Sequence, residues 1–279
     1  MPYSSKPIRI VVLSAYNLEN FGDRLGYYNI NAIVPENSEV TYASFIPWEV
    51  PHVSEIDILI LGIGNSIFEL LLGEHIIRLV ETVPCSIGIF GTQYRNKLNK
   101  NRFKRLVGAL DVWYARNEED LEWFGAFNSN SYHLGDWLIN LFPMSRPIIH
   151  EELNIAKYLA GLSSKINPLE HAPMDRIIQT IQRFQLVSSP KLHLLLCALT
   201  SAEKVSFSEQ RDFGFNEVSG KFNSLLKDVF GRHYPENDFF EVDKAKVIEY
   251  KIKVRRNMES LKLRLAELSM KSVQPIDGM

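Results

Sequence analysis

Residues 188–193, Ser-Ser-Pro-Lys-Leu-His, place a cation and an imidazole directly before a run of leucines. Ser189 can cap a helix and Pro190 can open it, because the first helical position needs no N–H. Lys191 and His193 then fall in the first turn, where free N–H groups and the helix dipole already attract an anion. The stretch predicts a pocket for a phosphate or a carboxylate. The alternative, a satisfied half-buried His193 and a solvated Lys191, stays open.

A second candidate cation follows another apolar stretch. Arg116 comes after Asp-Val-Trp-Tyr, at the carboxyl end of an expected strand. A guanidinium in that position can bind a carboxylate or a phosphate through two parallel hydrogen bonds. An ion pair with Glu118, Glu119 or Asp120 is an equally open interpretation. Arg116 is therefore a second candidate for holding an anionic ligand.

The loop Gly-Ile-Gly-Asn contains two glycines, Gly62 and Gly64, and ends at Asn65. It resembles a loop that lets the backbone approach a phosphate, but the full dinucleotide spacing with a downstream acid is missing. The histidines have no metal-ligand spacing, and neither a G-x-S-x-G elbow nor a Walker A sequence occurs. We therefore predict no metal and no other cofactor.

Strands and helices alternate through the first half of the chain. We expect strands within 8–13, 39–45, 56–65, 85–95 and 111–115, and helices over 22–34, over 66–82 and after Asn117, which can cap the last of them. This alternation predicts a parallel sheet covered on both faces, a Rossmann-like domain over residues 1–143. Ligands of such sheets bind beyond the carboxyl ends of the strands.

The second half predicts a smaller α/β domain over residues 144–242. Its expected elements are helices at 151–162, 174–184 and 190–201 and strands at 184–189 and 204–207.

An amphipathic helix is predicted for 243–270, because apolar residues recur there at helical spacing. They are Val247, Tyr250, Val254, Met258, Leu261, Leu265 and Leu268. Packing of this stripe along the two domains is the preferred interpretation. Pairing with a second copy, which would make a homo-oligomer, stays open.

Composition and charge limit the partners and the compartment. The net charge of -2 gives no long-range attraction to a polyanion, so nucleic acid is not expected as a partner. Cys85 and Cys197 both lie in apolar runs, as small buried side chains do in a reducing compartment. No apolar run approaches the roughly 20 residues that span a bilayer, and the first residues lack the apolar core of a signal peptide. We expect a cytoplasmic protein without a transmembrane segment.

Taken in order, six segments resemble the polysaccharide pyruvyl transferase family. They read NFGD, DILILGIGNSIF, FGTQYR, VWYARNEEDLEWFG, HLGDW and VSSPKLHLLLCAL. The resemblance implies an α/β fold of two Rossmann-like lobes, similar to GT-B glycosyltransferases, here with a reduced second lobe and a long C-terminal helix. It implies transfer of pyruvate from phosphoenolpyruvate to a sugar of a bacterial surface polysaccharide or of its precursor, which can be lipid-linked, as a ketal.

The resemblance also assigns roles by position. The family's arginine after the strand falls on Arg116, and its Arg-Leu-His motif falls on Lys191, Leu192 and His193, so that lysine stands where the family has arginine. His193 would then act as a general acid beside the two cations. The resemblance places further residues on the donor, which are Gly62, Gly64, Asn65, Ser189 and Leu192.

Three polar residues are implied for the sugar acceptor, and they are Asn20, Asp23 and Asp136. For the two aspartates, capping of a helix is the preferred interpretation. Two alternatives to pyruvyl transfer stay open, a sugar-nucleotide glycosyltransferase of GT-B shape and a non-catalytic relative that binds a glycan or a biosynthetic partner.

Overall fold

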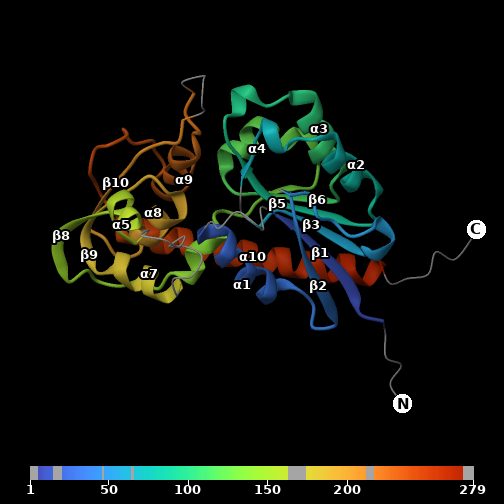
Figure 1. The fold of residues 1–279 in the computed structure, drawn as a ribbon, viewed down its shortest axis with the longest axis horizontal. Helices are drawn as coiled ribbons and strands as arrows, with labels where there is room; N and C mark the ends of the chain where they lie inside the picture. Colours follow the sequence, from blue (N-terminus) through green and yellow to red (C-terminus); the bar gives the residue numbers. More distant parts are fainter. Residues whose placement is uncertain are drawn as a thin grey trace, which may run out of the picture.

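The computed structural model describes residues 6–14, 21–45, 47–63, 66–162, 174–211 and 217–272, without the side chains of 160–162, 271 and 272. These residues form two α/β lobes joined along one long C-terminal helix (Figure 1). The predicted fold class, two Rossmann-like lobes of which the second is reduced, is confirmed.

The first lobe is built on a parallel sheet in the order β2-β1-β3-β5-β6-β7, in which every pairing is parallel. Its carboxyl ends therefore lie along one edge, where ligands of such sheets bind. The strands are β1 (Ile8–Ser14), β2 (Ser38–Ser44), β3 (Ile58–Leu61), β5 (Ser86–Thr92), β6 (Val112–Ala115) and β7 (Ser131–His133), and a short β4 (Ser66–Ile67) pairs with the end of β5.

Both faces of this sheet are buried, which explains the apolar run of residues 10–13 in β1. Ile10 and Val12 belong to one core with α1 (Phe21–Ile33). Val11 and Leu13 belong to a second core on the other face. Three helices cover that second face (Figure 1), and they are α2 (Glu74–Thr82), α3 (Lys100–Ala109) and α4 (Glu118–Phe124). Asn117 caps α4 as predicted, since its side chain accepts from the Asp120 N–H at 2.9 Å.

The prediction of one helix over 66–82 is wrong in its first half. Ser66 and Ile67 form β4, because they pair with Gly91 and Thr92 at the end of β5. A 3₁₀ turn, η2 (Glu69–Leu71), follows, and α2 begins only after Gly73. No element was predicted for the segments that form α3 and β7.

The second lobe has a smaller sheet in the order β11-β10-β9-β8. Its strands are β8 (Ile149–Asn154), β9 (Phe184–Ser189), β10 (Lys204–Phe207) and β11 (Phe240–Glu241), of which the first three are parallel and β11 is antiparallel. The described helices are α5 (Ile155–Leu162), α7 (Met174–Gln182), α8 (Leu192–Leu199) and α9 (Lys221–Phe230). The helix predicted from residue 151 begins only at Ile155, because Glu152 and its neighbours pair with β9.

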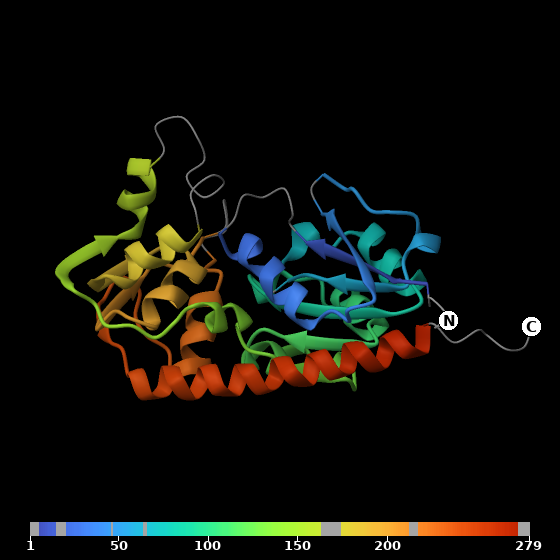
Figure 2. The ribbon, with the colours of Figure 1, turned by 90° about the horizontal axis from the view of Figure 1, so that it is seen from below.

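The last helix, α10 (Lys244–Ser272), runs beneath both lobes along the length of the molecule (Figure 2). Its predicted stripe packs within the chain, as preferred. Met258 is half-buried, and the buried members are Val247, Tyr250, Val254, Leu261, Leu265 and Leu268. Each such buried side chain stabilises the packing by about 1.5–3 kcal/mol, so the stripe is a strong tie between the lobes.

Lysines of α10 also close helix ends in both lobes. Lys244 Nζ donates to the carbonyl of Leu199 at 3.0 Å, at the end of α8. Lys251 Nζ donates to the carbonyl of Ile139 at 2.7 Å, in the 3₁₀ helix η5 (Trp137–Leu141). The domain limits predicted at residues 143 and 242 fall between η5 and β8 and just before α10. As limits of independent folding units they stay predictions.

Candidate functional site between the lobes

Arg116 lies at the carboxyl end of β6, inside the molecule. Only 5% of the residue is exposed, and its Nη2 donates to the Ser66 hydroxyl of β4 at 2.7 Å. β4 therefore holds the guanidinium at the binding edge of the first sheet.

The three acids that follow Arg116 have other cationic partners. Lys253 Nζ of α10 donates to Glu118. Arg95 pairs with Glu119 at 3.1 Å and with the fully buried Asp120 at 3.0 Å. Each of these three carboxylates therefore has a cationic partner other than Arg116.

His193, the second residue of α8, points from the second lobe toward the first. Its Nε2 lies 3.5 Å from Asp136 Oδ2, and only 8% of the residue is exposed. Its Nδ1 packs on Gly22 of α1, where a Cβ atom would come within 1.7 Å. Gly22 is therefore required by this close approach, and the imidazole is held between two elements of the first lobe.

Asp136 connects the two predicted catalytic residues. Its Oδ1 accepts from the Leu138 N–H at 3.4 Å and caps η5, so the capping prediction is confirmed, while Oδ2 faces His193. Burial opposes ionisation of Asp136, but the nearby His193 and the charge of Arg116 hold its pKa below the usual range. The two residues, predicted from distant segments, therefore act on the same buried carboxylate, His193 from 3.5 Å and Arg116 through its charge.

Lys221 adds a further cation that the sequence analysis missed. It is the first residue of α9. Burial lowers its pKa to about 8, and the positive charges of Arg116 and Lys191 add to this effect. The negative charges of Glu209 and Asp23 oppose the lowering. These groups surround a gap that is too small to hold a water molecule. Its lining is Arg116, Asn117, Asp136, Lys221 and Leu225. The one available signal was a lysine directly after Gly220 at a helix start, the same kind of pattern as at Lys191.

The start of α8 differs from the prediction. Lys191, not Ser189, is the N-cap residue, and the helix begins at Leu192. The reason is a local turn, in which the Ser189 hydroxyl accepts from the Lys191 N–H at 3.1 Å and donates to the Lys191 carbonyl at 2.9 Å. Pro190 precedes the helix. Ser189 and Leu192 are both buried at this turn, and Lys191 is exposed.

The N-termini of α8 and α9 differ in electrostatics. The first turn of α8 has neither an acidic residue nor a side-chain cap. At α9, the Glu209 carboxylate accepts from the N–H groups of Phe222 and Asn223, at 3.0 and 3.2 Å. The positive end of α9 is therefore already compensated, and α8 is the better place for an external anion.

The remaining predicted residues divide into three groups. Gly62 follows β3 with a φ of 84°, which favours glycine, and its N–H donates to the Leu13 carbonyl at 2.7 Å. That amide is therefore committed to the sheet and does not bind a phosphate. Asp23 is buried within the first turn of α1 and is not its cap, so that part of the prediction is wrong. Asn20, Gly64 and Asn65 lie outside the described residues.

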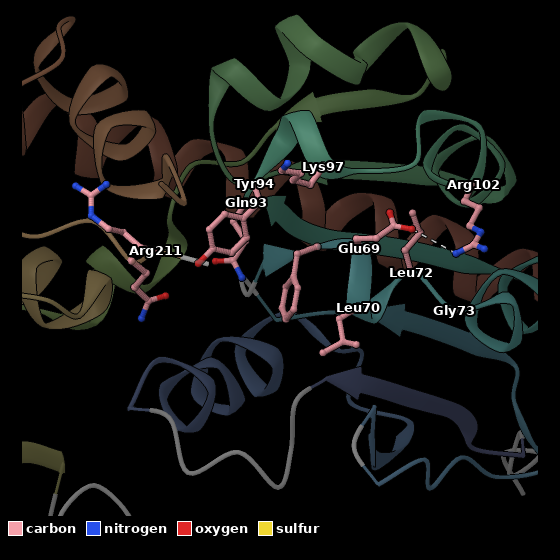
Figure 3. Close-up of a pocket in the computed structure, with 11 residues that line it drawn as sticks. Glu69, Leu70, Leu72, Gly73, Gln93, Tyr94, Lys97, Arg102 and Arg211 are labelled. Carbon is pink, nitrogen blue, oxygen red and sulfur yellow. Dashed lines mark hydrogen bonds and ion pairs between the residues drawn. The ribbon is translucent and has the colours of Figure 1, made fainter. Parts of the chain in front are cut away.

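A separate, wide cleft of about 1050 Å³ is lined by residues of both lobes (Figure 3). Gln210 and Arg211 reach it from the second lobe, opposite Gln93 and Tyr94 of the first, and Leu70, which is 78% exposed, lies along it. The rest of the lining is Phe68, Glu69, Leu72, Gly73, Lys97 and Arg102. Phe68 follows β4, and Ser66 of β4 accepts a hydrogen bond from Arg116. This end of the cleft is therefore close to Arg116.

The described part of the chain lacks two features, a metal-binding group and a membrane-spanning helix. It contains no group of three or more His, Cys, Asp and Glu residues arranged to hold a metal ion. None of its helices combines the length and apolarity needed to cross a membrane. Cys85 and Cys197 are buried free thiols, and burial raises the pKa of Cys197.

Comparisons with known proteins give little further information. No family model and no curated protein matches the chain. Among solved structures, the crystal structure of a protein described as the glycotransferase of kitacinnamycin aligns over 96% of this chain and 98% of its own, at a TM-score of 0.44 and 10% identity. No function follows for this chain from a likeness of that size.

Proposed function

We propose that the protein transfers pyruvate from phosphoenolpyruvate to a saccharide and forms a pyruvate ketal. The observation that carries the proposal is that His193 from one lobe and Arg116 from the other both lie near Asp136. The ordered motifs resembling polysaccharide pyruvyl transferases support the same chemistry. The acceptor, in this proposal, belongs to a surface polysaccharide or its precursor.

The donor needs two places for negative charge, one for its carboxylate and one for its phosphate. The Arg116 guanidinium can bind either group through two parallel hydrogen bonds. Lys221 lies within electrostatic range of Arg116, and Lys191 with the uncapped start of α8 offers a further positive locus. The buried position of Arg116 strengthens its attraction for an anion, because little water screens it.

The reaction also needs a proton for the vinyl carbon of the donor. As one acceptor hydroxyl bonds to the carbon that carries the phosphate, the neighbouring vinyl carbon takes a proton from His193, and the imidazole takes the proton that this hydroxyl loses. The second hydroxyl then replaces the phosphate oxygen, and its proton leaves with inorganic phosphate. Asp136 stabilises the imidazolium before transfer, as a carboxylate does in other acid–base pairs.

The wide cleft is the proposed acceptor site. It reaches Phe68 next to β4, and its lining combines aromatic rings with the amides of Gln93 and Gln210. Rings can pack on sugar faces, and amides can bind hydroxyls. An acceptor lying there would bring its terminal hydroxyls toward Arg116.

Phosphate release tests the proposal. Purified protein is incubated with phosphoenolpyruvate and a panel of oligosaccharides and lipid-linked saccharides, and inorganic phosphate is measured together with the mass of the product. The expected result is phosphate release with a saccharide that gains one ketal-linked pyruvate. A parallel panel of sugar nucleotides tests the alternative, since release of a nucleoside diphosphate would replace pyruvyl transfer by glycosyl transfer.

Two variants separate the roles. Arg116→Lys keeps the charge but loses the two parallel hydrogen bonds, so it is expected to weaken phosphoenolpyruvate binding about tenfold. His193→Gln is expected to bind the donor and lose turnover by about 10²-fold or more. Lys204→Met, an exposed site on β10, is the control. Unchanged donor affinity in Arg116→Lys together with unchanged turnover in His193→Gln would reject the site.

A further inference from the structure

A second, chemically different cavity lies in the second lobe. It measures about 270 Å³ and is lined by Glu152, Asn154, Ala156, Ser188, Ser189, Pro190, Ser206, Phe207, Ser208, Asn237 and Phe239. Asn154, Ser189 and Phe207 are the last residues of β8, β9 and β10. The cavity therefore occupies the carboxyl edge of the three parallel strands, where open α/β sheets bind ligands.

The lining contains hydroxyl and amide groups with unused hydrogen-bonding capacity. Ser206 is 4% exposed and lines the cavity. Asn154 Oδ1 accepts from the Lys157 N–H at 3.0 Å, and Asn237 Oδ1 accepts from the Ser208 hydroxyl at 2.5 Å. Both amides thus leave their nitrogens as donors toward a ligand.

One acceptor and one ring complete the set. Glu152 Oε1 accepts from the Ser188 hydroxyl at 2.6 Å, which fixes the carboxylate and leaves Oε2 for a ligand. Phe239 is 41% exposed and offers a flat apolar face. Among the described lining residues of the cavity there is no lysine, arginine or histidine, and the Glu152 carboxylate disfavours an anionic ligand.

These groups fit a neutral ring that carries neighbouring hydroxyls. Two adjacent hydroxyls can donate to one carboxylate, while their oxygens accept from amide nitrogens. The volume lies near the lower end of the range for small-molecule sites, about 300–1,000 Å³, which suits one sugar ring with or without an attached group.

We propose that this pocket binds a sugar ring through Glu152, Asn154 and Asn237, with the ring or a base attached to it lying on Phe239. The ring belongs either to a pyranose or to the ribose of a nucleoside, because both present the same pair of hydroxyls. The proposal does not depend on pyruvyl transfer. It concerns a cavity that borders the turn before α8 but whose described lining contains neither Arg116 nor His193, and it is tested by binding, not by turnover.

Ligand binding to the full chain tests the proposal. Saturation-transfer NMR and calorimetry are run with uridine, adenosine, glucose and N-acetylglucosamine at millimolar concentration. The expected result is saturable binding of at least one, and whether nucleosides or pyranoses bind identifies the source of the ring. Glu152→Gln is expected to weaken that binding about tenfold, since a neutral amide accepts more weakly than a carboxylate.

Glu151→Gln is the matched control. Glu151 is the preceding residue of β8, is exposed and is absent from the lining, because successive side chains of a strand point to opposite sides. It is expected to leave binding unchanged, and circular dichroism checks that both variants fold. Absence of binding by all four compounds would overturn the proposal. So would equal affinity in Glu152→Gln and wild type, or an equal loss in both variants.

Discussion

The carboxyl edges of the two sheets occupy equivalent places in their lobes but carry opposite chemistry. At the first edge, Arg116, Arg95 and Asp120 form a buried charged layer. At the second edge, serines and asparagines surround a cavity among whose described lining residues there is no cation. The topology thus determines where a ligand can bind, and the side chains after each strand determine which ligand. Under the two proposals, the same edge of a parallel sheet would bind an anion in the first lobe and a neutral ring in the second.

The two edges also differ in how tightly their side chains are fixed. Asp120 accepts from Thr92, Asn117 and Arg95, and Arg95 also donates to Ser224 of the second lobe at 2.9 Å. Such a layer is preorganised to hold charge, because its members cannot reorient without breaking several bonds. At the second edge, Ser206 lines the cavity, and the side-chain nitrogens of Asn154 and Asn237 remain as donors for a ligand. The following substitutions test this difference.

Replacing Arg95 is expected to have the largest effect. Arg95→Met leaves the fully buried Asp120 without its ion-pair partner, which should lower the free energy of unfolding by about 3–5 kcal/mol. Urea denaturation measures the change. Arg105→Met, which removes an exposed arginine paired with Glu74 and Glu81, is the control and should leave the midpoint nearly unchanged. A small effect of Arg95→Met would mean that the charged layer is not a rigid scaffold.

Gly22→Ala tests the contact that holds His193 between the lobes. The added Cβ would lie 1.7 Å from Nδ1, so the imidazole must leave Asp136 or α1 must shift, at a cost of about 1–3 kcal/mol. Turnover is expected to fall together with stability. Gly125→Ala is the control, since its nearest neighbours lie at 3.7 Å and its φ is negative. Thermal unfolding that is equal in both variants would contradict the close packing of His193 on α1.

The lowered pKa of Lys221 predicts a pH dependence of donor binding. Its pKa of about 8 lies below the ordinary 10.5, so the lysine is charged at neutral pH and becomes neutral as the pH rises through about 8. Phosphoenolpyruvate affinity should therefore fall several-fold between about pH 7 and about pH 9.5. Lys221→Arg keeps its charge over this range and should lack the decrease. Calorimetry at several pH values measures it, and a decrease that persists in Lys221→Arg would assign the titration to another group.

The lowered pKa of Lys221 also affects the stability of the fold, in the opposite direction to its effect on donor binding. Between about pH 8 and 10.5 the unfolded chain binds a proton at Lys221 that the folded chain does not bind. The contribution of this group to the free energy of unfolding therefore rises with pH over that window. Donor binding and stability should move in opposite directions there, which a general loss of structure at high pH would not produce.

Sequence patterns singled out two of the side chains near Asp136 but not all of them. Arg116 and His193 were singled out because strand ends and helix starts are local features, one in each lobe. Lys221 escaped, because its burial beside Arg116 depends on a contact across 105 positions of sequence that no local pattern encodes. β4 escaped for a similar reason, since two residues become a strand only by pairing with β5. The shifted start of α8 followed from the Ser189 turn, which competes with the proline signal.

The smallest effect on donor binding is expected from replacing Lys191. Lys191 is exposed at the uncapped start of α8, so Lys191→Met should weaken phosphoenolpyruvate binding only about two- to fivefold, because water screens its charge. Lys204→Met, an exposed lysine of the same lobe, should change nothing. Raising the salt concentration should reduce the loss at Lys191 and leave the effect of Arg116→Lys nearly intact, since Arg116 is buried. Equal salt sensitivity at both positions would place both cations in the same solvent environment and remove the distinction between an inner and an outer anion contact.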